Sequence, residues 1–252
     1  MSRRVTVLLA GAGLLLATVL ILAATRSSSA MAATPTVVDC ARAEARRNFT
    51  AFKDYQCDLT SYRKTWTMDG KMDRDVVVVK KLYVKPPKKK ELFVSGTLNG
   101  QAIQENDLYF ERLGLADAMS FTDIEVFRAG NENKFRVEQE TNPALLFGTQ
   151  MRVLKFTSLA PGQTNLQTGR MFLPMDSCRV VRIEGKFVQR TIINNTVDFT
   201  ATLQPVTAQV WLPVELTVKG IVSLGIMKRR MDTRNVFANY RVNTGLTDAF
   251  FH

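Results

Sequence analysis

Histidine is almost absent from this 252-residue chain, and cysteine is scarce. His252, the last residue, is the one histidine, and Cys40, Cys57 and Cys178 show no CxxC spacing. An interior Ser-His-Asp or Cys-His arrangement is therefore excluded, as is a metal site of clustered histidines and cysteines. The glycines lie at predicted turns and helix ends, and the carboxylates lie mostly in polar stretches, which argues against a phosphate loop or a two-carboxylate hydrolase. We expect a protein without catalysis, metal or other cofactor.

Long apolar runs are equally scarce, since the chain has one, at residues 5–24. Arg3 and Arg4 precede it, and Ala30-Met31-Ala32 follows it with the small-x-small pattern that signal peptidase cleaves. This pattern predicts a signal peptide at residues 1–32 and export to the periplasm. A run of about 20 apolar residues can also span a bilayer, so an uncleaved inner-membrane anchor is the alternative.

The remaining residues, 33–252, are expected to form a single domain. A length of about 220 residues suits one domain with a substantial core. Loss of the signal removes three arginines and no acid, so the net charge falls from +11 to +8. An oxidising compartment permits one disulfide, but an odd number of cysteines leaves the pairing undetermined.

The mature sequence predicts one N-terminal helix and then many strands. Apolar residues recur every three or four positions over residues 36–53, which is typical of an amphipathic helix. From Tyr55 onward the period is two, and Asp69-Gly70, Pro86-Pro87 and Asn99-Gly100 mark turns between strands. The clearest alternation predicts four apolar strand faces: Val181, Ile183 and Phe187; Val197, Phe199, Ala201 and Leu203; Val210, Leu212, Val214, Leu216 and Val218; and Val236, Ala238, Tyr240 and Val242.

The spacing of these segments predicts an antiparallel meander. About nine to eleven strands are joined by short turns, without the helices that a parallel sheet needs between its strands. One interruption is predicted at residues 142–148, where Asn142, Pro143 and Gly148 have the positions of an N-cap, a first helical residue and a C-terminal glycine. Its body is apolar, so a short helix lying over the sheet is expected, and a second short helix is predicted at residues 113–119.

A lysine cluster surrounds the Pro86-Pro87 turn. Its members are Lys80, Lys81, Lys85, Lys88, Lys89 and Lys90. A solvated hairpin tip explains them, and docking to an anionic membrane through Lys85, Lys88, Lys89 and Lys90 is the alternative. No basic helical stripe accompanies the charge, so a nucleic-acid partner is not expected.

Particular residues carry a family resemblance that spans most of the mature chain. Residues 48–60 (NFTAFKDYQCDLT) and 81–88 (KLYVKPPK) resemble the opening of outer-membrane lipoprotein-sorting proteins, the LolA-like family. Residues 172–185 (FLPMDSCRVVRIEG) and 211–215 (WLPVE) are similar to later strands of that family. The resemblance implies an α+β, mainly β, fold: a strongly curved antiparallel sheet, an unclosed barrel, with an N-terminal helix and short lid helices.

The same resemblance implies a periplasmic carrier or chaperone that holds acyl chains in the apolar concave face of the sheet. The expected cargo is a lipid or lipoprotein, handed over by membrane-protein donors and acceptors, and the protein is expected to be a monomer. Cavity candidates are Leu82, Val84, Ile183, Phe187, Phe199, Leu203, Leu212, Leu216 and Tyr240, and lid candidates are Leu145, Leu146 and Phe147. The same side chains are equally suited to fill a dry core. The alternative function is an envelope protein-interaction or stress-sensing module, which a Trp211 on the polar side of its strand would favour.

Overall fold

One α-helix opens the part of the chain that the structure describes. The computed structural model describes residues 36–108, 126–128, 130–131, 133–161, 165–189, 195–224 and 227–252. Helix α2 (Val37–Ala51) begins at a capping box, in which the Thr36 hydroxyl accepts a hydrogen bond from the Asp39 N–H and the Asp39 carboxylate accepts one from the Thr36 N–H. These bonds satisfy N–H groups that a helix start leaves unpaired. The predicted N-terminal helix is confirmed.

Several predicted features lie outside the described residues. They include Arg3 and Arg4, the apolar run, the predicted cleavage after Ala32 and the short helix at residues 113–119. Within the described ranges, no helix combines the length and the apolar character needed to cross a bilayer.

All described strands belong to one sheet. They are β1 (Tyr55–Trp66), β2 (Met72–Lys85), β3 (Lys88–Leu98), β4 (Gln101–Ala102), β5 (Phe135–Gln139), β6 (Ala144–Leu146), β7 (Thr149–Ser158), β8 (Leu166–Pro174), β9 (Arg182–Gln189), β10 (Asn195–Pro205), β11 (Trp211–Leu224) and β12 (Met227–Val242). Two short 3-10 helices, η1 (Glu105–Leu108) and η5 (Asp248–Phe251), complete the described elements.

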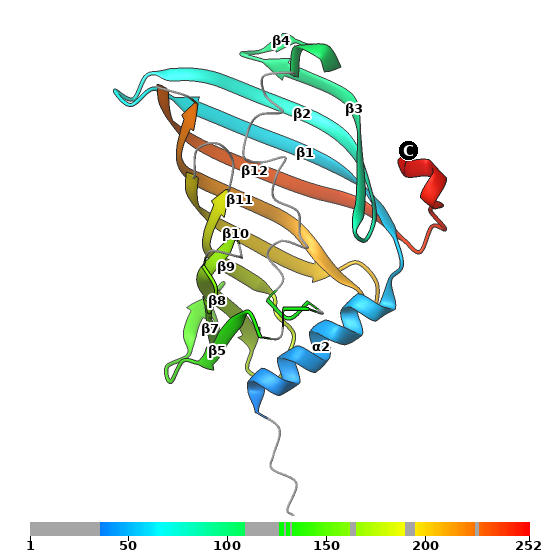
Figure 1. Ribbon diagram of the computed structural model, residues 1–252, viewed down its shortest axis with the longest axis vertical. Coiled ribbons are helices and arrows are strands. Elements are labelled where there is room, and N and C mark those ends of the chain that lie inside the picture. Colours follow the sequence, from blue (N-terminus) through cyan, green and yellow to red (C-terminus); the bar gives the residue numbers. More distant parts are fainter. Residues whose placement is uncertain are drawn as a thin grey trace, which may run out of the picture. The chain divides into compact units, whose positions relative to one another are not determined.

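The sheet is antiparallel and open, as the sequence predicted. Its twelve strands run in the order β4-β3-β2-β1-β12-β11-β10-β9-β8-β7-β5, with β6 paired to β7. The two edges, β4 and β5, are not joined, so the sheet is not closed into a barrel (Figure 1). The first and last strands are neighbours at its middle. The connection from β4 to β5 therefore links opposite edges of the sheet.

The short helix predicted at residues 142–148 is wrong, because this segment forms a hairpin. Strand β6 pairs with β7, and the turn between them has Phe147 at φ 52° and Gly148 at φ 75°. Two successive residues with positive φ suit a two-residue hairpin loop. Pairing with the edge of β7 gives the segment backbone partners that a helix of about one turn cannot supply. This strand also brings the total above the predicted nine to eleven.

The predicted apolar faces are confirmed on β9, β10 and β11 except where the register shifts. Ile183, Phe187, Val197, Phe199, Ala201, Leu203, Val210, Leu212, Leu216 and Val218 are all buried. Val214 is half-buried instead, since a register shift between Thr202 and Leu203 places Pro213 opposite Leu203. Val181 was also assigned wrongly, because it precedes β9 and packs with Phe172 in a separate cluster.

The face predicted for β12 is wrong in its first half. Met231, Thr233 and Asn235 are buried, whereas Val236 is half-buried and Ala238 is exposed. A register shift against β1 follows, and Asn239 has φ 55° there. An extra residue in one strand exchanges the two faces. After it, Tyr240 and Val242 pack against the main core, as predicted.

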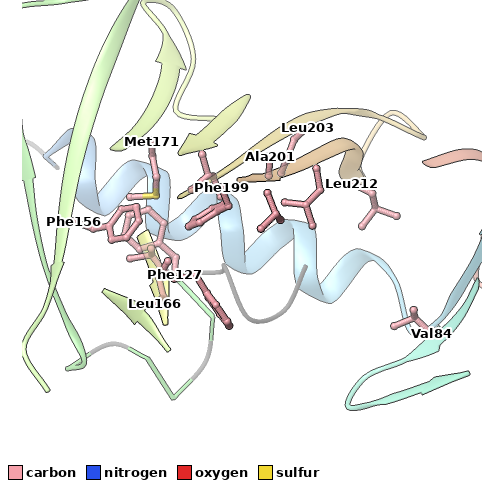
Figure 2. Packing of buried hydrophobic residues seen from close by; sticks show 14 of the residues in the cluster. Val84, Phe127, Phe156, Leu166, Met171, Phe199, Ala201, Leu203 and Leu212 are labelled. Atoms are coloured by element: carbon pink, nitrogen blue, oxygen red, sulfur yellow. The ribbon is translucent and has the colours of Figure 1, made fainter. Parts of the chain in front are cut away.

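Two facing glycines allow close packing in the main core. Gly169 and Gly185 are in register on β8 and β9, and the Phe156 ring lies directly over Gly169. A side chain at either glycine would overlap backbone atoms of the neighbouring strand. Figure 2 shows Phe156, Met171 and Phe199 gathered beside Phe127, with α2 running along the same cluster.

A buried carboxylate fixes the chain that follows β12 to the start of β1. Asp54 is 4% exposed and accepts hydrogen bonds from the Thr244 N–H and hydroxyl (both 2.7 Å) and from the N–H groups of Gly245 (3.1 Å) and Leu246 (3.3 Å). Burial acts to raise the pKa of Asp54, but these hydrogen bonds outweigh it and hold the pKa below its ordinary value. The fold therefore favours the charged form.

Asp54→Asn is expected to reduce the free energy of unfolding by about 2 kcal/mol at neutral pH, because an amide is a weaker acceptor for four donors. The folded pKa is depressed, so this stabilisation is complete above the unfolded pKa of about 3.9 and disappears as the pH falls through the folded value. Urea unfolding at a series of pH values measures it. The difference between the two proteins should begin to shrink below about pH 4 and vanish below the folded pKa, and a pH-independent difference would contradict the assignment.

Candidate ligand-binding face

The sheet has one face, here called the inner face, whose side chains pack with α2 in the main core. Eight of the cavity candidates belong to this cluster and are between 0% and 7% exposed: Leu82, Val84, Ile183, Phe187, Phe199, Leu203, Leu212 and Leu216. Tyr240 is partly buried and packs against them, and its hydroxyl donates a hydrogen bond to the Pro213 carbonyl at 2.6 Å. The structure therefore brings all nine candidates to one face of the sheet.

Helix α2 is fastened to the sheet along its length. A disulfide joins Cys40, in its first turns, to Cys178 in the loop after β8. The Arg179 guanidinium donates to the Glu44 carboxylate, with Nε 2.6 Å from Oε1. The Asn48 side chain bonds both the N–H of Trp211 (2.6 Å) and its carbonyl (3.0 Å). These contacts hold α2 as a fixed cover over part of the inner face.

Trp211 is not an exposed recognition residue, contrary to the alternation in the sequence. It is half-buried and packs against the main core, with the Arg179 guanidinium carbon 5.1 Å from the centre of its ring. The reason is α2, whose Asn48 holds the backbone at the start of β11. The register shift between Thr202 and Leu203 places Trp211 on the side of Ile183 and Leu203, next to α2, and alternation along one strand cannot reveal this shift.

A small cleft lies between α2 and the strand ends. Its lining includes Ala41 and Ala45 from the helix and Met171, Ile183 and Leu203 from the sheet, and its volume is about 40 Å³. One water needs roughly 10–15 Å³ on this measure. The cleft therefore accepts a few atoms but not an acyl chain.

The inner face is much larger than the helix that covers it. Eleven strands lie side by side, which at about 4.8 Å per spacing gives a width of roughly 48 Å. The 15 residues of α2 make a helix about 22 Å long. Even laid straight across the strands, α2 spans less than half of this width.

A second apolar cluster occupies the inner face near β4. Val76 and Val78 on β2 are 3% and 6% exposed and pack with the partly buried Phe93, Leu98 and Ile103. Ile103 begins the connection that leaves β4, whereas Val126 and Phe127, close to its other end, are buried in the main core. Both described ends of this connection thus contact apolar clusters of the inner face.

Between the two clusters lies a group of polar side chains that the sequence analysis did not single out. We call Ser61, Arg63 and Thr65 of β1 with Thr233 and Asn235 of β12 the polar strip. Three of them are buried, with Arg63 7%, Thr233 2% and Asn235 5% exposed. The signal was present in the sequence, because the alternation that starts at Tyr55 places these β1 residues on the inner face when it is continued to Trp66.

The lysine cluster is engaged with partners inside the protein. Lys85 and Lys88 contact the Asp248 carboxylate at 3.1 and 3.5 Å, and Lys85 and Lys88 hold the pKa of Asp248 below its ordinary value. Lys89 pairs with Glu91 at 2.8 Å, and the Lys90 ammonium donates to the Phe250 carbonyl at 2.7 Å. These lysines therefore fasten η5 and stabilise the β2–β3 hairpin.

The lid candidates lie away from the cavity candidates. Leu145 is 75% and Phe147 73% exposed, and Leu146 packs with Met151 and Phe172 in a cluster separate from the main core. Phe172 alternates with the inward Met171, so this cluster lies on the outer face. The hairpin that replaces the predicted helix places Leu146 on the outer face and leaves Leu145 and Phe147 exposed.

Cys57 is a buried thiol within the main core. Burial raises its pKa to about 12, although a hydrogen bond with Tyr240 acts in the opposite direction. The thiol is therefore protonated at neutral pH and is not a nucleophile. Within the described residues, no group of three or more His, Cys, Asp or Glu side chains is placed to hold a metal ion.

Comparison with known proteins gives matches among solved structures. Neither a family model nor a curated protein matches the chain. A DUF1329 family protein from Desulfovibrio piger has a TM-score of 0.44 and 13% identity, covering 87% of this chain and 98% of that chain. MucB of Pseudomonas aeruginosa, solved with MucA, has a TM-score of 0.23 and 9% identity over 81% of this chain and 99% of that chain. A domain from Vibrio parahaemolyticus, described as an outer membrane lipoprotein-sorting protein, has a TM-score of 0.44 and 11% identity over 86% of this chain and 97% of that chain.

Proposed function

We propose that the protein is an exported, periplasmic carrier or chaperone that holds the acyl chains of a lipid or lipoprotein against the inner face of its sheet. The observation that carries this proposal is the size of an apolar inner face that α2 spans by less than half. The sequence resemblance to LolA-like carriers points the same way. The competing interaction module depended on an exposed Trp211, which is half-buried beside α2.

The fastening of α2 indicates where cargo would enter. The disulfide, the Glu44–Arg179 pair and the Asn48 contacts hold the helix over one part of the face. The cluster around Val76 and Val78 lies outside these contacts, and we place the acyl chain there. Burying a dozen methylenes at about 0.8 kcal/mol each contributes on the order of 10 kcal/mol before the costs of association.

Neighbouring valines of β2 provide a matched test. Val78 faces inward in the apolar cluster, and Val77 faces outward on the same strand. Val78→Asp is expected to weaken binding of a fluorescent fatty acid at least about tenfold, because it places a carboxylate in the apolar cluster that would contact the chain. Val77→Asp should bind as the wild type does. Circular dichroism and thermal melts check that both variants are folded.

Native mass spectrometry of protein purified from a membrane-containing extract gives an independent measurement. The expected result is a bound lipid mass that is reduced in Val78→Asp and retained in Val77→Asp. Wild-type protein that carries no lipid and takes up no fatty acid would reject the carrier proposal.

A further inference from the structure

The outer face of the sheet carries an exposed apolar row at the end of the sheet away from α2, where the β1–β2 and β11–β12 hairpins lie side by side (Figure 1). We call Ile221 of β11, Arg230 of β12, Trp66 of β1 and Met72 of β2 the outer row, because they lie in register across four adjacent strands. Trp66 follows Thr65 of the polar strip and therefore faces outward. Ile221 is 49% and Met72 50% exposed. Single exposed aliphatic residues are ordinary, but these two flank an aromatic ring in one continuous row.

The turn that follows Trp66 adds a third exposed apolar side chain, Met68, which is 59% exposed. Hydrogen bonds fix this turn, from the Thr67 N–H to the Lys71 carbonyl at 2.9 Å and from the Gly70 N–H to the Thr67 carbonyl at 3.0 Å. Met68 is therefore held in solvent by an ordered turn. Exposing several large aliphatic side chains together is unfavourable in water, so this end of the sheet is suited to being covered by another surface.

The charge around the outer row is positive. Residues 64–75 and 219–232 hold seven basic and four acidic side chains, which gives a net charge of +3. Three of the four acids contact a basic neighbour, in the pairs Asp73–Arg229, Asp75–Lys64 and Asp232–Lys219. On the next two strands Lys186 and Asp198 pair with each other. The acids of η1, Glu105 and Asp107, follow Ile103, whose side chain packs with the cluster on the inner face.

Arg230 and Trp66 indicate what kind of partner suits this surface. The guanidinium carbon of the exposed Arg230 lies 4.5 Å from the centre of the Trp66 ring. Tryptophan is enriched at membrane–water interfaces, where its ring sits at the level of the lipid headgroups, and basic side chains are attracted to anionic lipids. Aliphatic side chains beside them can enter the boundary between headgroups and acyl chains. An anionic bilayer thus matches both the apolar and the charged members of the row.

We propose that the outer row, together with Met68 and Lys228, is a docking surface for an anionic lipid bilayer. Lys228 is exposed and lies two residues before Arg230 on β12, so it shares the outer face. In the docked protein Met68 and the aliphatic members of the row enter the interfacial layer, and the Trp66 ring lies among the headgroups. Lys228 and Arg230 contact the lipid phosphates.

This surface lies close to the proposed acyl site but acts separately from it. Val76 and Val78 are four and six residues after Met72 on β2, which places them roughly 13 and 20 Å further along the strand. Docking would therefore bring the end of the inner face near the membrane. It requires no lipid on the inner face, so the docking surface and the carrier function can be tested independently.

Vesicle flotation tests the charge requirement. Vesicles of equal parts phosphatidylglycerol and phosphatidylcholine are compared with vesicles of phosphatidylcholine alone. At low salt the wild type is expected to bind the anionic vesicles at least about tenfold more tightly, since each basic residue near an anionic surface contributes about a factor of five. High salt should remove most of this preference, because it screens exposed charges.

Two pairs of matched substitutions test the location. Met72→Glu is expected to weaken binding to the anionic vesicles at least about tenfold. Met175→Glu is its control, because Met175 is 51% exposed and follows β8 at the opposite end of the strands. Lys228→Glu should weaken binding to a similar degree, whereas Lys53→Glu, an exposed position just before β1, should not. Thermal melts check that all four proteins are folded.

Trp66 provides a spectroscopic readout that a general loss of stability would not produce. The chain has two tryptophans, and the other, Trp211, is half-buried beside α2. Docking is expected to shift the emission to shorter wavelength, and vesicles with brominated acyl chains should quench it. Trp66→Phe should lose this response. A bound wild type whose response survives in Trp66→Phe would show that another surface docks.

The remaining outcomes separate the two proposals. Val78→Asp should dock like the wild type, even if it takes up no fatty acid. Equal binding to neutral and anionic vesicles, or wild-type binding by Met72→Glu, would overturn the docking surface and leave the carrier function standing. Binding to native membrane vesicles but not to protein-free anionic vesicles would identify a membrane protein as the partner and reject the bilayer.

Discussion

Replacing Leu216 by aspartate is expected to abolish folding or cargo uptake. Leu216 is 3% exposed on β11, between Ala201 of β10 and Asn235 of β12. No described basic side chain lies in register with it on these two strands, so a carboxylate there would be buried and unpaired. The combined loss of apolar burial and gain of an unpaired charge is about 5 kcal/mol or more, which is comparable with the whole stability of many domains.

Thr217→Asp is the matched control for this substitution. Thr217 is the next residue, faces outward and lies opposite Arg234, which would pair with the new carboxylate. Far-UV circular dichroism and urea unfolding compare the two variants. Fatty-acid uptake is then measured for each variant that is folded. A fully active and stable Leu216→Asp protein would show that the inner face has been assigned to the wrong side of the sheet.

Loss of the Cys40–Cys178 disulfide is expected to lower the free energy of unfolding by about 3–5 kcal/mol. The bridge joins residues separated by 138 positions, and closing a long loop restricts the unfolded chain most strongly. It also fastens the start of α2 to the loop after β8. The Cys40→Ser/Cys178→Ser variant should therefore unfold at lower urea concentration, with the Glu44–Arg179 and Asn48–Trp211 contacts still present.

Reductant provides the control for the disulfide. It should destabilise the wild type to the level of the double variant and leave the double variant unchanged, because Cys57 is buried and forms no disulfide. Equal urea midpoints for oxidised wild type and double variant would show that the bridge does not contribute to stability.

Lipid uptake by the same disulfide variant tests whether α2 has to move for lipid to bind. If α2 is a fixed cover, as its contacts indicate, releasing one end should not be needed for binding. Cargo bound on the side of Val76 and Val78 then has the same affinity in both proteins. A large gain in affinity for the variant would place the entrance under α2 instead.

Local sequence patterns were sufficient for the elements whose signals do not depend on distant residues. The helix at Val37–Ala51 follows from its apolar spacing, and the Asn99-Gly100 turn follows from two residues that tolerate positive φ, here 51° and 83°. Alternation placed Phe199, Ala201 and Leu216 on the buried face without error. Each signal is contained in a short stretch of chain.

Strand register and pairing at the sheet edge could not be predicted from short stretches of sequence. The extra residue near Asn239 exchanges the faces of β12, and it is visible only when β12 is aligned with β1. Residues 142–148 have helix signals at both ends, yet the free edge of β7 makes them a strand. In both cases a distant strand supplied the hydrogen bonds that decided the outcome.

The sequence by itself determined the antiparallel meander, the helix that precedes it and most residues of its apolar face. The tertiary structure decided that Cys40 bonds to Cys178, that Leu146 packs on the outer face and that Arg63 lies beside Thr233. The physical reason is that β1 and β12 are far apart in the chain but adjacent in the sheet. The polar strip, to which both β1 and β12 contribute, therefore forms only when these two strands pair.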